Sequence, residues 1–251
     1  MKKFIISIIL ALIFSVQAFA EGVTLPILLY HNITSEDGNY DPDVHISQKN
    51  FKEQIDYLKE NNYSTITFRD YYDYRTTGKE LPKKPIIITF DDGYRSNYDI
   101  AYPYLKEKGM KATIFTVTHS AYIPKTFSYD HFNWAEAKEM VKSGVIDIES
   151  HSAGHLIHIY LSYNACLYQA RRSFFDIYKN TGKRPFTYAY PTGAFTAESQ
   201  MIVKDAGFVV QCSVQGKLND DMTPLNELRR LNIRGDVTLE EFKNLIENSP
   251  L

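Results

Sequence analysis

The sequence has little cysteine and no marked excess of charge of either sign. Its two cysteines, Cys166 and Cys212, lack the paired spacing of a zinc site. The 28 basic and 30 acidic residues give a formal net charge of −2, which argues against a nucleic-acid partner. There is also no Pro/Gly/Ser-rich linker, low-complexity tract or internal repeat, so the 251 residues fit a single domain.

The long apolar run of this sequence lies at its N-terminus. Two lysines precede the apolar residues 4–14, and Ala18-Phe19-Ala20 has the small-x-small pattern of a signal-peptidase site. Two polar residues interrupt the run, which falls short of the roughly 20 residues of a spanning helix. We therefore expect residues 1–20 to be an export signal and 21–251 to be an exported mature chain without stable membrane insertion. An uncleaved anchor is the alternative.

Export permits a disulfide, and the two cysteines of the mature chain could form one. Alternatively, each is a small buried hydrophobic residue, because Cys166 lies in an expected helix and Cys212 follows an apolar segment. The sequence leaves both alternatives open.

Strand-like and helix-like segments alternate along the mature chain, which predicts one α/β domain. The expected strands are 25–30, 64–67, 86–90, 112–117, 145–150, 186–190, 208–213 and 231–233. The expected helices are one that begins after Ser47 and ends at Asn61-Asn62, then 98–108, 134–142, 163–180 and 197–205. Seven or eight such units favour a closed or nearly closed β/α barrel, whose catalytic groups gather at the carboxyl ends of the strands.

Two adjacent acids and two later histidines follow expected strands. The β-branched run 85–90 predicts a buried strand that delivers Asp91 and Asp92 to a rim. Adjacent carboxylates are costly unless a cation lies between them or only one of them binds it. His151 and His155 follow another strand about sixty residues later. One aspartate and two histidines can hold a divalent metal and leave a coordination position open for water.

Each of these motifs also has a simpler explanation. Asp-Asp-Gly after a strand is usually a polar turn, and two histidines four residues apart can lie on a solvated helix face. Their combination, each placed after a strand, favours a metal site over both simpler explanations.

Three segments together resemble a known family. They are Thr89-Phe90-Asp91-Asp92-Gly93, His151-Ser152-Ala153-Gly154-His155 and Tyr188-Ala189-Tyr190-Pro191-Thr192-Gly193. In order and approximate spacing they resemble the first three motifs of the polysaccharide deacetylases, the NodB homology domain of carbohydrate esterase family 4. The resemblance covers nearly the whole mature chain. It implies a distorted (β/α)7-type barrel that removes N-acetyl groups from an N-acetylglucosamine-containing polysaccharide, or acetyl esters from a polysaccharide such as xylan.

The resemblance also implies a role for each motif residue. Asp92, His151 and His155 would hold a divalent metal, with zinc expected and cobalt, nickel or iron as alternatives. Asp91 would be the general base that takes a proton from the metal-bound water. Thr192 stands where a backbone N–H would stabilise the oxyanion, and a change of side chain there spares that donor.

The third motif departs from the commoner form of the family, in which an arginine at the position of Ala189 steadies the base. It looks like the form of the subgroup that includes poly-β-1,6-N-acetylglucosamine deacetylases. The commoner form takes its proton donor from a histidine near the C-terminus, yet no histidine follows His158. In the subgroup a histidine in an N-terminal Tyr-His context has this role, which matches Tyr30-His31. His31 is therefore the expected acid, and a structural cap of the first strand is its alternative role.

The remaining histidines, at 45, 119, 131 and 158, are expected at the surface or in the lining of a pocket. A catalytically silent carbohydrate-binding protein on the same fold is the alternative from another functional class. Such a protein would be expected to lack Asp91 or a metal ligand, and this sequence retains them all. The expected partner is accordingly a polysaccharide substrate.

Overall fold

The computed structural model describes residues 22–35, 40–125 and 129–251. The expected export signal, residues 1–20, lies outside these ranges. Within them, no helix combines the length and the apolar character needed to cross a membrane.

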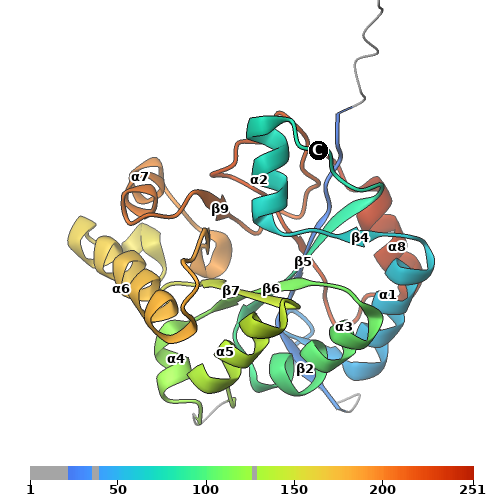
Figure 1. Cartoon of the computed structure of the whole chain (residues 1–251), viewed down its shortest axis with the longest axis horizontal. Helices are drawn as coiled ribbons and strands as arrows, with labels where there is room; N and C mark the ends of the chain where they lie inside the picture. The colour runs from blue at the N-terminus through green and yellow to red at the C-terminus, as the bar shows by residue number, and fades with distance from the viewer. Residues whose placement is uncertain (1–21, 36–39, 126–128) are drawn as a thin grey trace, which may run out of the picture.

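A curled sheet of parallel strands forms a half-barrel at the centre of the molecule (Figure 1). The strand order is β10-β1-β5-β6-β7-β8-β9, and β4 pairs with the start of β5. These strands are β1 (Ile27–Tyr30), β4 (Ser64–Thr65), β5 (Pro85–Asp92), β6 (Ala112–Thr116), β7 (Ile146–Ser150), β8 (Thr187–Ala189), β9 (Val210–Cys212) and β10 (Leu231–Asn232). Because every pairing is parallel, the carboxyl ends of the strands lie along one edge.

Helices surround this sheet, and the last helix lies beside the first (Figure 1). They are α1 (Gln48–Glu60), α2 (Phe68–Thr77), α3 (Tyr102–Lys108), α4 (Thr118–Tyr122), α5 (Trp134–Ser143), α6 (Tyr163–Thr181), α7 (Ala197–Asp205) and α8 (Leu239–Asn248). Three shorter turns are η1 (Asn97–Ala101), η2 (His158–Tyr160) and η3 (Pro191–Gly193), and a separate pair of strands is formed by β2 (Asn32–Thr34) and β3 (His45–Ser47).

The alternation of side chains along β5 turns Asp91 toward the inside of the curled sheet. Ile88 and Phe90 pack in the core that the sheet shares with α1, α3 and α5. Ile87 packs instead in a second core, together with Phe115 of β6. Since successive side chains of a strand point to opposite faces, Asp91 lies on the same face as Ile87.

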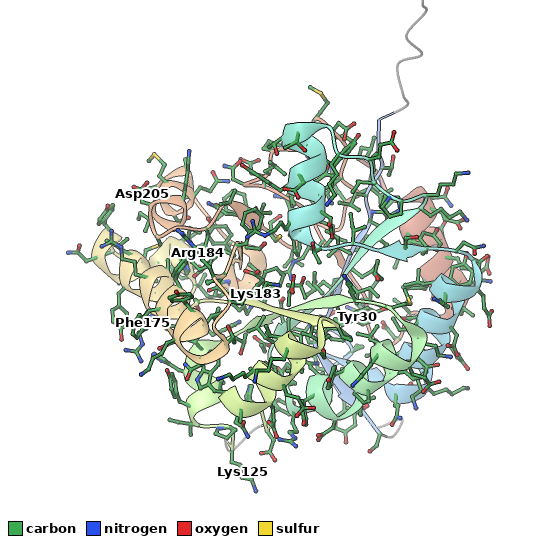
Figure 2. All side chains as sticks on the ribbon, viewed as in Figure 1. Tyr30, Lys125, Phe175, Lys183, Arg184 and Asp205 are labelled. Carbon is green, nitrogen blue, oxygen red and sulfur yellow. The ribbon has the colours of Figure 1, made fainter. Side chains whose placement is uncertain are left out.

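Two of the aromatic side chains labelled in Figure 2 differ widely in exposure. Tyr30, at the end of β1, is fully buried and donates its hydroxyl to Gln54 Oε1 over 2.7 Å. Phe175 projects outward from α6 and is 53% exposed. The last residue of β1 is therefore held by the core, immediately before His31.

The structure confirms the predicted α/β barrel architecture, and each of the eight expected strands is present. The strand expected over 86–90 is longer than predicted, so Asp91 and Asp92 are its last two residues rather than the residues after it. Three helices, α2, α4 and α8, were not predicted. In α2 only Phe68 and Tyr71 are buried, so its sequence has no extended apolar period.

The helix expected over 98–108 begins differently from the prediction. Its first turn, η1, is a π-helix in which the N–H of Tyr102 bonds to the carbonyl of Asn97. Pro103 follows at the start of α3. Because proline lacks an N–H and its ring crowds the carbonyl four residues earlier, the turn before it widens.

The two cysteines are free and buried, Cys166 in α6 and Cys212 at the end of β9. The structure thus favours the second alternative, in which each is a small buried hydrophobic residue. Burial raises the pKa of Cys166 to about 11 and that of Cys212 to about 12, which keeps both as thiols.

Candidate functional site

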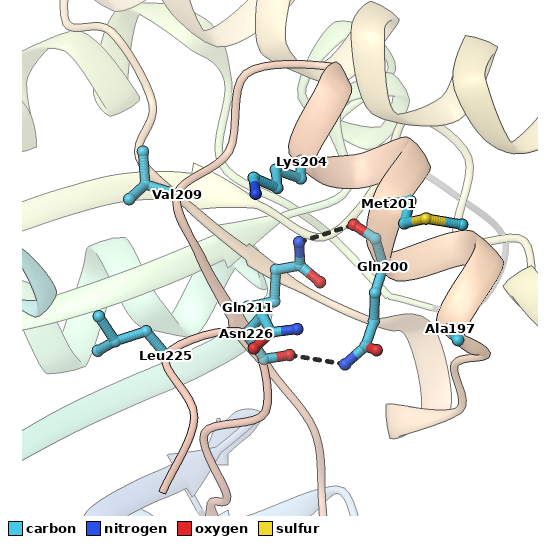
Figure 3. Close-up of a pocket in the computed structure, with 8 residues that line it drawn as sticks. All are labelled: Ala197, Gln200, Met201, Lys204, Val209, Gln211, Leu225 and Asn226. Atoms are coloured by element: carbon cyan, nitrogen blue, oxygen red, sulfur yellow. Dashed lines mark hydrogen bonds between the residues drawn. The ribbon is translucent and has the colours of Figure 1, made fainter. Parts of the chain in front are cut away.

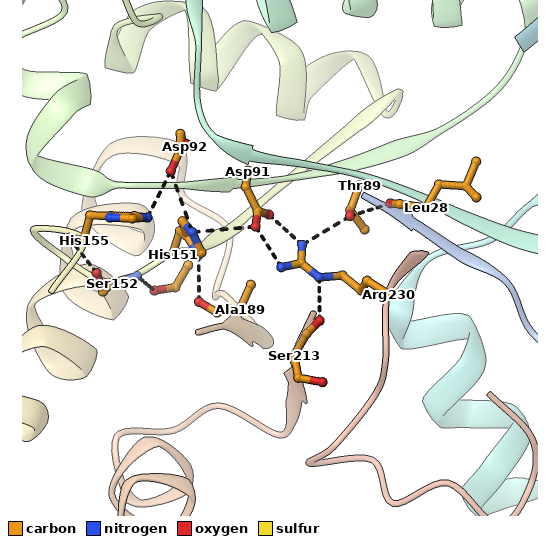
Figure 4. A network of polar contacts seen from close by, with 11 residues as sticks. Leu28, Thr89, Asp91, Asp92, His151, Ser152, His155, Ala189, Ser213 and Arg230 are labelled. Atoms are coloured by element: carbon orange, nitrogen blue, oxygen red, sulfur yellow. Dashed lines mark hydrogen bonds and ion pairs between the residues drawn. The ribbon is translucent and has the colours of Figure 1, made fainter. Parts of the chain in front are cut away.

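Asp92, His151 and His155 meet at the carboxyl edge of the sheet (Figure 4). One ligand atom from each lies within 4.8 Å of the others. His155 Nε2 is 3.4 Å from Asp92 Oδ1, and His151 Nε2 is 3.7 Å from the same oxygen. Two imidazole nitrogens and one carboxylate oxygen at this separation are a donor set suited to a divalent metal such as zinc.

The backbone of this cluster is strained. Six described non-glycine residues have a positive φ, and three of them are Asp92 (68°), Ser152 (69°) and His155 (56°). Left-handed backbone is costly for such residues and persists where the surrounding structure enforces it, often at functional sites. Here it turns Asp92 out of β5 and turns the loop after β7 back toward it.

A backbone carbonyl sets the orientation of His151. Its Nδ1 lies 2.8 Å from the carbonyl oxygen of Ala189, so Nδ1 carries the proton and Nε2 presents its lone pair. Burial lowers the pKa of His151, although Asp91 and Asp92 oppose this shift. The neutral imidazole is the form that binds a metal.

A relay of serines supports the loop that carries His155. Ser152 Oγ accepts the N–H of His155 over 2.9 Å, and Ser150 Oγ accepts the N–H of Ser152 over 3.1 Å. Ser150 in turn donates to Ser173 of α6 over 2.7 Å. The short side chains of the motif thus fix the histidine through hydrogen bonds.

Asp91 is held by an arginine that the sequence analysis did not find. Arg230 Nη1 and Nη2 donate to the two carboxylate oxygens of Asp91 over 2.6 and 2.7 Å (Figure 4). Both side chains are buried, with exposures of 0% and 2%. A bidentate pair of this kind fixes both the position and the charge of the carboxylate.

Arg230 lies where the two ends of the curled sheet approach each other. Leu228 bridges to Cys212 of β9, whereas Leu231 pairs with Leu28 of β1. From this seam the guanidinium also donates from Nε to the carbonyl oxygen of Ser213 over 3.2 Å. The sequence Leu228-Arg229-Arg230-Leu231 places two arginines directly before the last expected strand, and this was the available signal.

Opposing influences act on the pKa of Asp91. Burial raises this pKa, but the charge of Arg230 and the proximity of His151 lower it by more. The net result is a pKa of about 2. Asp91 is therefore a carboxylate at neutral pH. Its Oδ2 lies 3.6 Å from His151 Nε2, beside the metal-ligand cluster.

The structure places His31 near this pair and Thr192 at the exposed rim. His31, between β1 and β2, is partly buried, and its charged form would lower the pKa of Asp91. Asn97, in the π-turn η1, donates from Nδ2 to the His31 carbonyl over 2.8 Å and so holds this segment. Thr192 has a φ of 61° in η3, shortly after β8, and is exposed.

A pocket of about 440 Å³ opens beside the cluster. Its lining is Asp92, Tyr94, Val117, His119, Ser120, Tyr129, His131, Gly154 and His155. His119 and His131 thus line a pocket, as predicted. His45 and His158 are 6% and 3% exposed, so of the two expected placements the surface does not hold for either.

Another pocket, of about 430 Å³, lies beside α7 (Figure 3). Gln200 Nε2 donates to the carbonyl of Asn226, and Gln211 Nε2 donates to the carbonyl of Gln200, each over 3.0 Å. Lys204 is the one titratable side chain in its lining. Asp92 and three histidines, by contrast, line the pocket beside the cluster.

Comparison with known proteins identifies the family. Residues 78–210, just over half of the chain, match the family model described as polysaccharide deacetylase. The chain therefore belongs to the polysaccharide deacetylase family. It is 42% identical over 133 residues to a Bacillus subtilis protein that carries this family name; the match covers 53% of this chain and 43% of that protein.

Two further relatives extend the comparison. Poly-β-1,6-N-acetyl-D-glucosamine N-deacetylase of Staphylococcus aureus is 29% identical over 182 residues, covering 68% of this chain and 62% of that protein. A crystal structure of a polysaccharide deacetylase from Bacillus cereus has a TM-score of 0.78 and 25% identity, covering 90% of this chain and 70% of that one. The match spans less than two thirds of either curated relative.

Proposed function

We propose that residues 21–251 form a metal-dependent hydrolase that removes N-acetyl groups from an N-acetylglucosamine-containing polysaccharide. The observation that carries this proposal is the juxtaposition of a two-histidine, one-aspartate cluster with a second, arginine-bound aspartate. The family membership and the similarity to a poly-β-1,6-N-acetyl-D-glucosamine N-deacetylase support the substrate class. We further propose that residues 1–20 direct export, since such a substrate lies outside the cell.

Asp92, His151 and His155 would hold the metal, and zinc fits their donor atoms best. When bound, a divalent metal supplies Lewis acidity, which polarises the acetyl carbonyl and lowers the pKa of water. The neutral His151 can bind a cation without first losing a proton.

Asp91 would act as the general base. It accepts a proton from the water whose oxygen attacks the carbonyl carbon, and Arg230 keeps its carboxylate oriented for this transfer. The negative charge that develops on the carbonyl oxygen would be stabilised by the backbone N–H of Thr192. The carbon–nitrogen bond then breaks, and acetate and the sugar amine are released.

His31 would donate the proton that the departing nitrogen needs. Its place at the end of β1, close enough to Asp91 to influence the pKa of that group, supports this role. The bond from Asn97 to the His31 carbonyl would keep the imidazole beside the base.

Acetate release tests this function directly. Purified residues 21–251 would be incubated with β-1,4- and β-1,6-linked N-acetylglucosamine oligomers, with chelator and after addition of zinc or cobalt. We expect metal-dependent release from at least one linkage. Asp91→Asn should retain the metal and lose most turnover, because an amide cannot accept the proton. Release of acetate from acetylated xylan alone would instead favour an ester hydrolase.

The proton donor is tested with two substrates. His31→Ala should lose roughly 10²–10⁴-fold in turnover on an amide substrate. It should lose much less on an activated aryl acetate, whose leaving group departs without a proton. Equal losses on both substrates, with a lower melting temperature, would assign His31 a structural role instead.

A further inference from the structure

A continuous row of aromatic rings leads away from the pocket beside the cluster. Tyr94 stacks on His131 with 5.4 Å between ring centroids, and Tyr129 packs edge-on against Tyr94 at 5.5 Å. His45 follows Tyr129 at 5.2 Å, and Tyr40 stacks on His45 at 5.1 Å. We call these five residues the aromatic ridge.

The inner end of the ridge belongs to the pocket beside the cluster. Tyr94, Tyr129 and His131 line that pocket together with Asp92 and His155. The ridge is therefore continuous with the place where the acetyl group would react.

The backbone holds the inner rings in place. An antiparallel bridge pairs Tyr94 with His131. On either side of it, Arg95 donates its N–H to the carbonyl of Asp130 over 2.8 Å, and Phe132 donates to the carbonyl of Gly93 over 3.3 Å. Because these bonds begin directly after β5, the ridge is tied to the same strand end as Asp92.

Burial differs along the ridge in a way that fits ligand binding. Tyr94 and His45 are 8% and 6% exposed, whereas Tyr129 and Tyr40 are 40% and 50% exposed. The buried rings brace the exposed ones, and His45 is itself held by its Nδ1 contact with the Asp41 carbonyl at 3.1 Å. Two supported, half-exposed tyrosines beside a pocket are suited to contact the faces of a ligand.

We propose that Tyr129 and Tyr40 bind, by ring stacking, the sugar units next to the unit whose acetyl group is removed. This inference rests on the proposed deacetylase function and makes its substrate a chain of several units. The C–H-rich faces of pyranose rings pack against aromatic rings, and each ring-to-ring step of the ridge is comparable to the breadth of one sugar.

Charge favours a neutral sugar chain over an anionic polymer. The lining of the pocket contains Asp92 and three histidines but no lysine or arginine. Uncharged N-acetylated units are therefore the occupant that the ridge fits, with their acetyl groups directed to the cluster.

The test measures how KM depends on substrate length in variants of the full enzyme. Acetate release by wild type, Tyr40→Ala, Tyr129→Ala and the double variant would be measured on N-acetylglucosamine oligomers from two to six units. We expect KM on the longer oligomers to rise roughly 3- to 10-fold for each tyrosine removed, with little change in kcat and a smaller effect on the dimer. Tyr40→Phe and Tyr129→Phe should restore the wild-type KM because they retain the ring.

Tyr178→Ala is the matched control, since Tyr178 is 54% exposed on α6 and lies outside the pocket lining. It should leave every KM unchanged. If wild type is active and Tyr40→Ala and Tyr129→Ala have the same KM as wild type at every oligomer length, the ridge proposal is overturned while the deacetylase function stands. Wild type that releases no acetate from any oligomer would overturn the proposed function, and with it this inference.

Discussion

At the residue scale, the pairing of Asp91 with Arg230 explains how a buried carboxylate remains ionised. Burial alone would favour the protonated acid, whereas the bidentate guanidinium favours the carboxylate. This arginine lies directly before β10, whereas position 189, where the resembling family commonly has an arginine, is an alanine here. The charge partner of Asp91 thus comes from the segment between β9 and β10.

Replacing Arg230 by methionine should change the pH dependence of turnover. Without the guanidinium, burial dominates and the pKa of Asp91 rises. As the solution is acidified, the base is then protonated sooner, and activity is lost at a higher pH than in wild type. We expect the acid limb of kcat/KM to move up by at least about one pH unit, since one unit corresponds to about 1.4 kcal/mol and a charged hydrogen bond contributes about 1.5–3 kcal/mol.

Arg230→Lys provides the control, because it keeps a positive charge and loses the bidentate geometry. Its acid limb should lie between those of wild type and Arg230→Met. Coincident pH profiles for all three proteins would show that Arg230 does not set the ionisation of Asp91.

His158 should make folding stability sensitive to acid. Its Nε2 accepts the hydroxyl of Tyr188 over 2.8 Å, its Nδ1 contacts the carbonyl of Leu156, and burial lowers its pKa from 6.5 to about 4. The folded state therefore disfavours the protonated imidazole. The free energy of unfolding should be intact above pH 6.5 and should fall by on the order of 3 kcal/mol as the pH drops toward 4.

Urea denaturation across this pH range, compared with His158→Gln, isolates the contribution of His158. Glutamine can still accept the tyrosine hydroxyl and does not titrate, so the stability of the variant should fall less between pH 6.5 and 4. Parallel curves for the two proteins would mean that other groups cause the acid sensitivity.

At the element scale, the turn after β5 requires glycine at position 93. Gly93 has a φ of 80°, and an added Cβ would lie 2.7 Å from Thr116 Oγ1 on β6. The turn therefore combines left-handed backbone with close approach to the neighbouring strand. This combination allows β5 to end at Asp92 while the chain bends toward the aromatic ridge.

Gly93→Ala should destabilise the protein more than Gly78→Ala. Gly78 has a φ of 75° but no atom within 4 Å of an added Cβ, so it measures the backbone cost alone, about 1–2 kcal/mol. At Gly93 the overlap with Thr116 should add roughly 1–3 kcal/mol. Urea denaturation in the presence of chelator measures both variants, and equal losses at the two positions would refute the steric argument.

At the scale of the whole molecule, the cluster draws its donors from separate parts of the sheet. Asp92 ends β5, whereas His151 and His155 follow β7, with β6 between them. A ligand that binds these groups only when they are assembled stabilises the folded state by mass action.

Adding zinc should therefore raise the melting temperature. At a free zinc concentration of 100 times the dissociation constant, the folded state is stabilised by about 2.7 kcal/mol. For a domain of this size, that free energy raises the melting temperature by roughly 5–10 °C. Scanning calorimetry with chelator and with zinc measures the difference. Asp92→Ala should abolish it, and Asp205→Ala, which removes an exposed aspartate at the end of α7, should preserve it. A zinc effect that survives in Asp92→Ala would remove Asp92 from the ligand set.

The sequence by itself determined the strands, most of the helices and the placement of Asp91, Asp92, His151 and His155 at strand ends. These features depend on local patterns, namely apolar runs, helix caps and glycines after helices. One helix that it did not reveal, α2, buries only Phe68 and Tyr71, which are too few apolar residues to produce a period.

Only the tertiary structure decided which groups complete the site. Arg230 lies 139 residues from Asp91 in the chain and meets it because the last strand closes onto β1. The aromatic ridge likewise joins Tyr40 and His45 to Tyr129, and no local pattern relates their positions. Contacts between distant segments arise from the packing of the whole curled sheet, so periodicity and spacing along the chain do not encode them in a readable form.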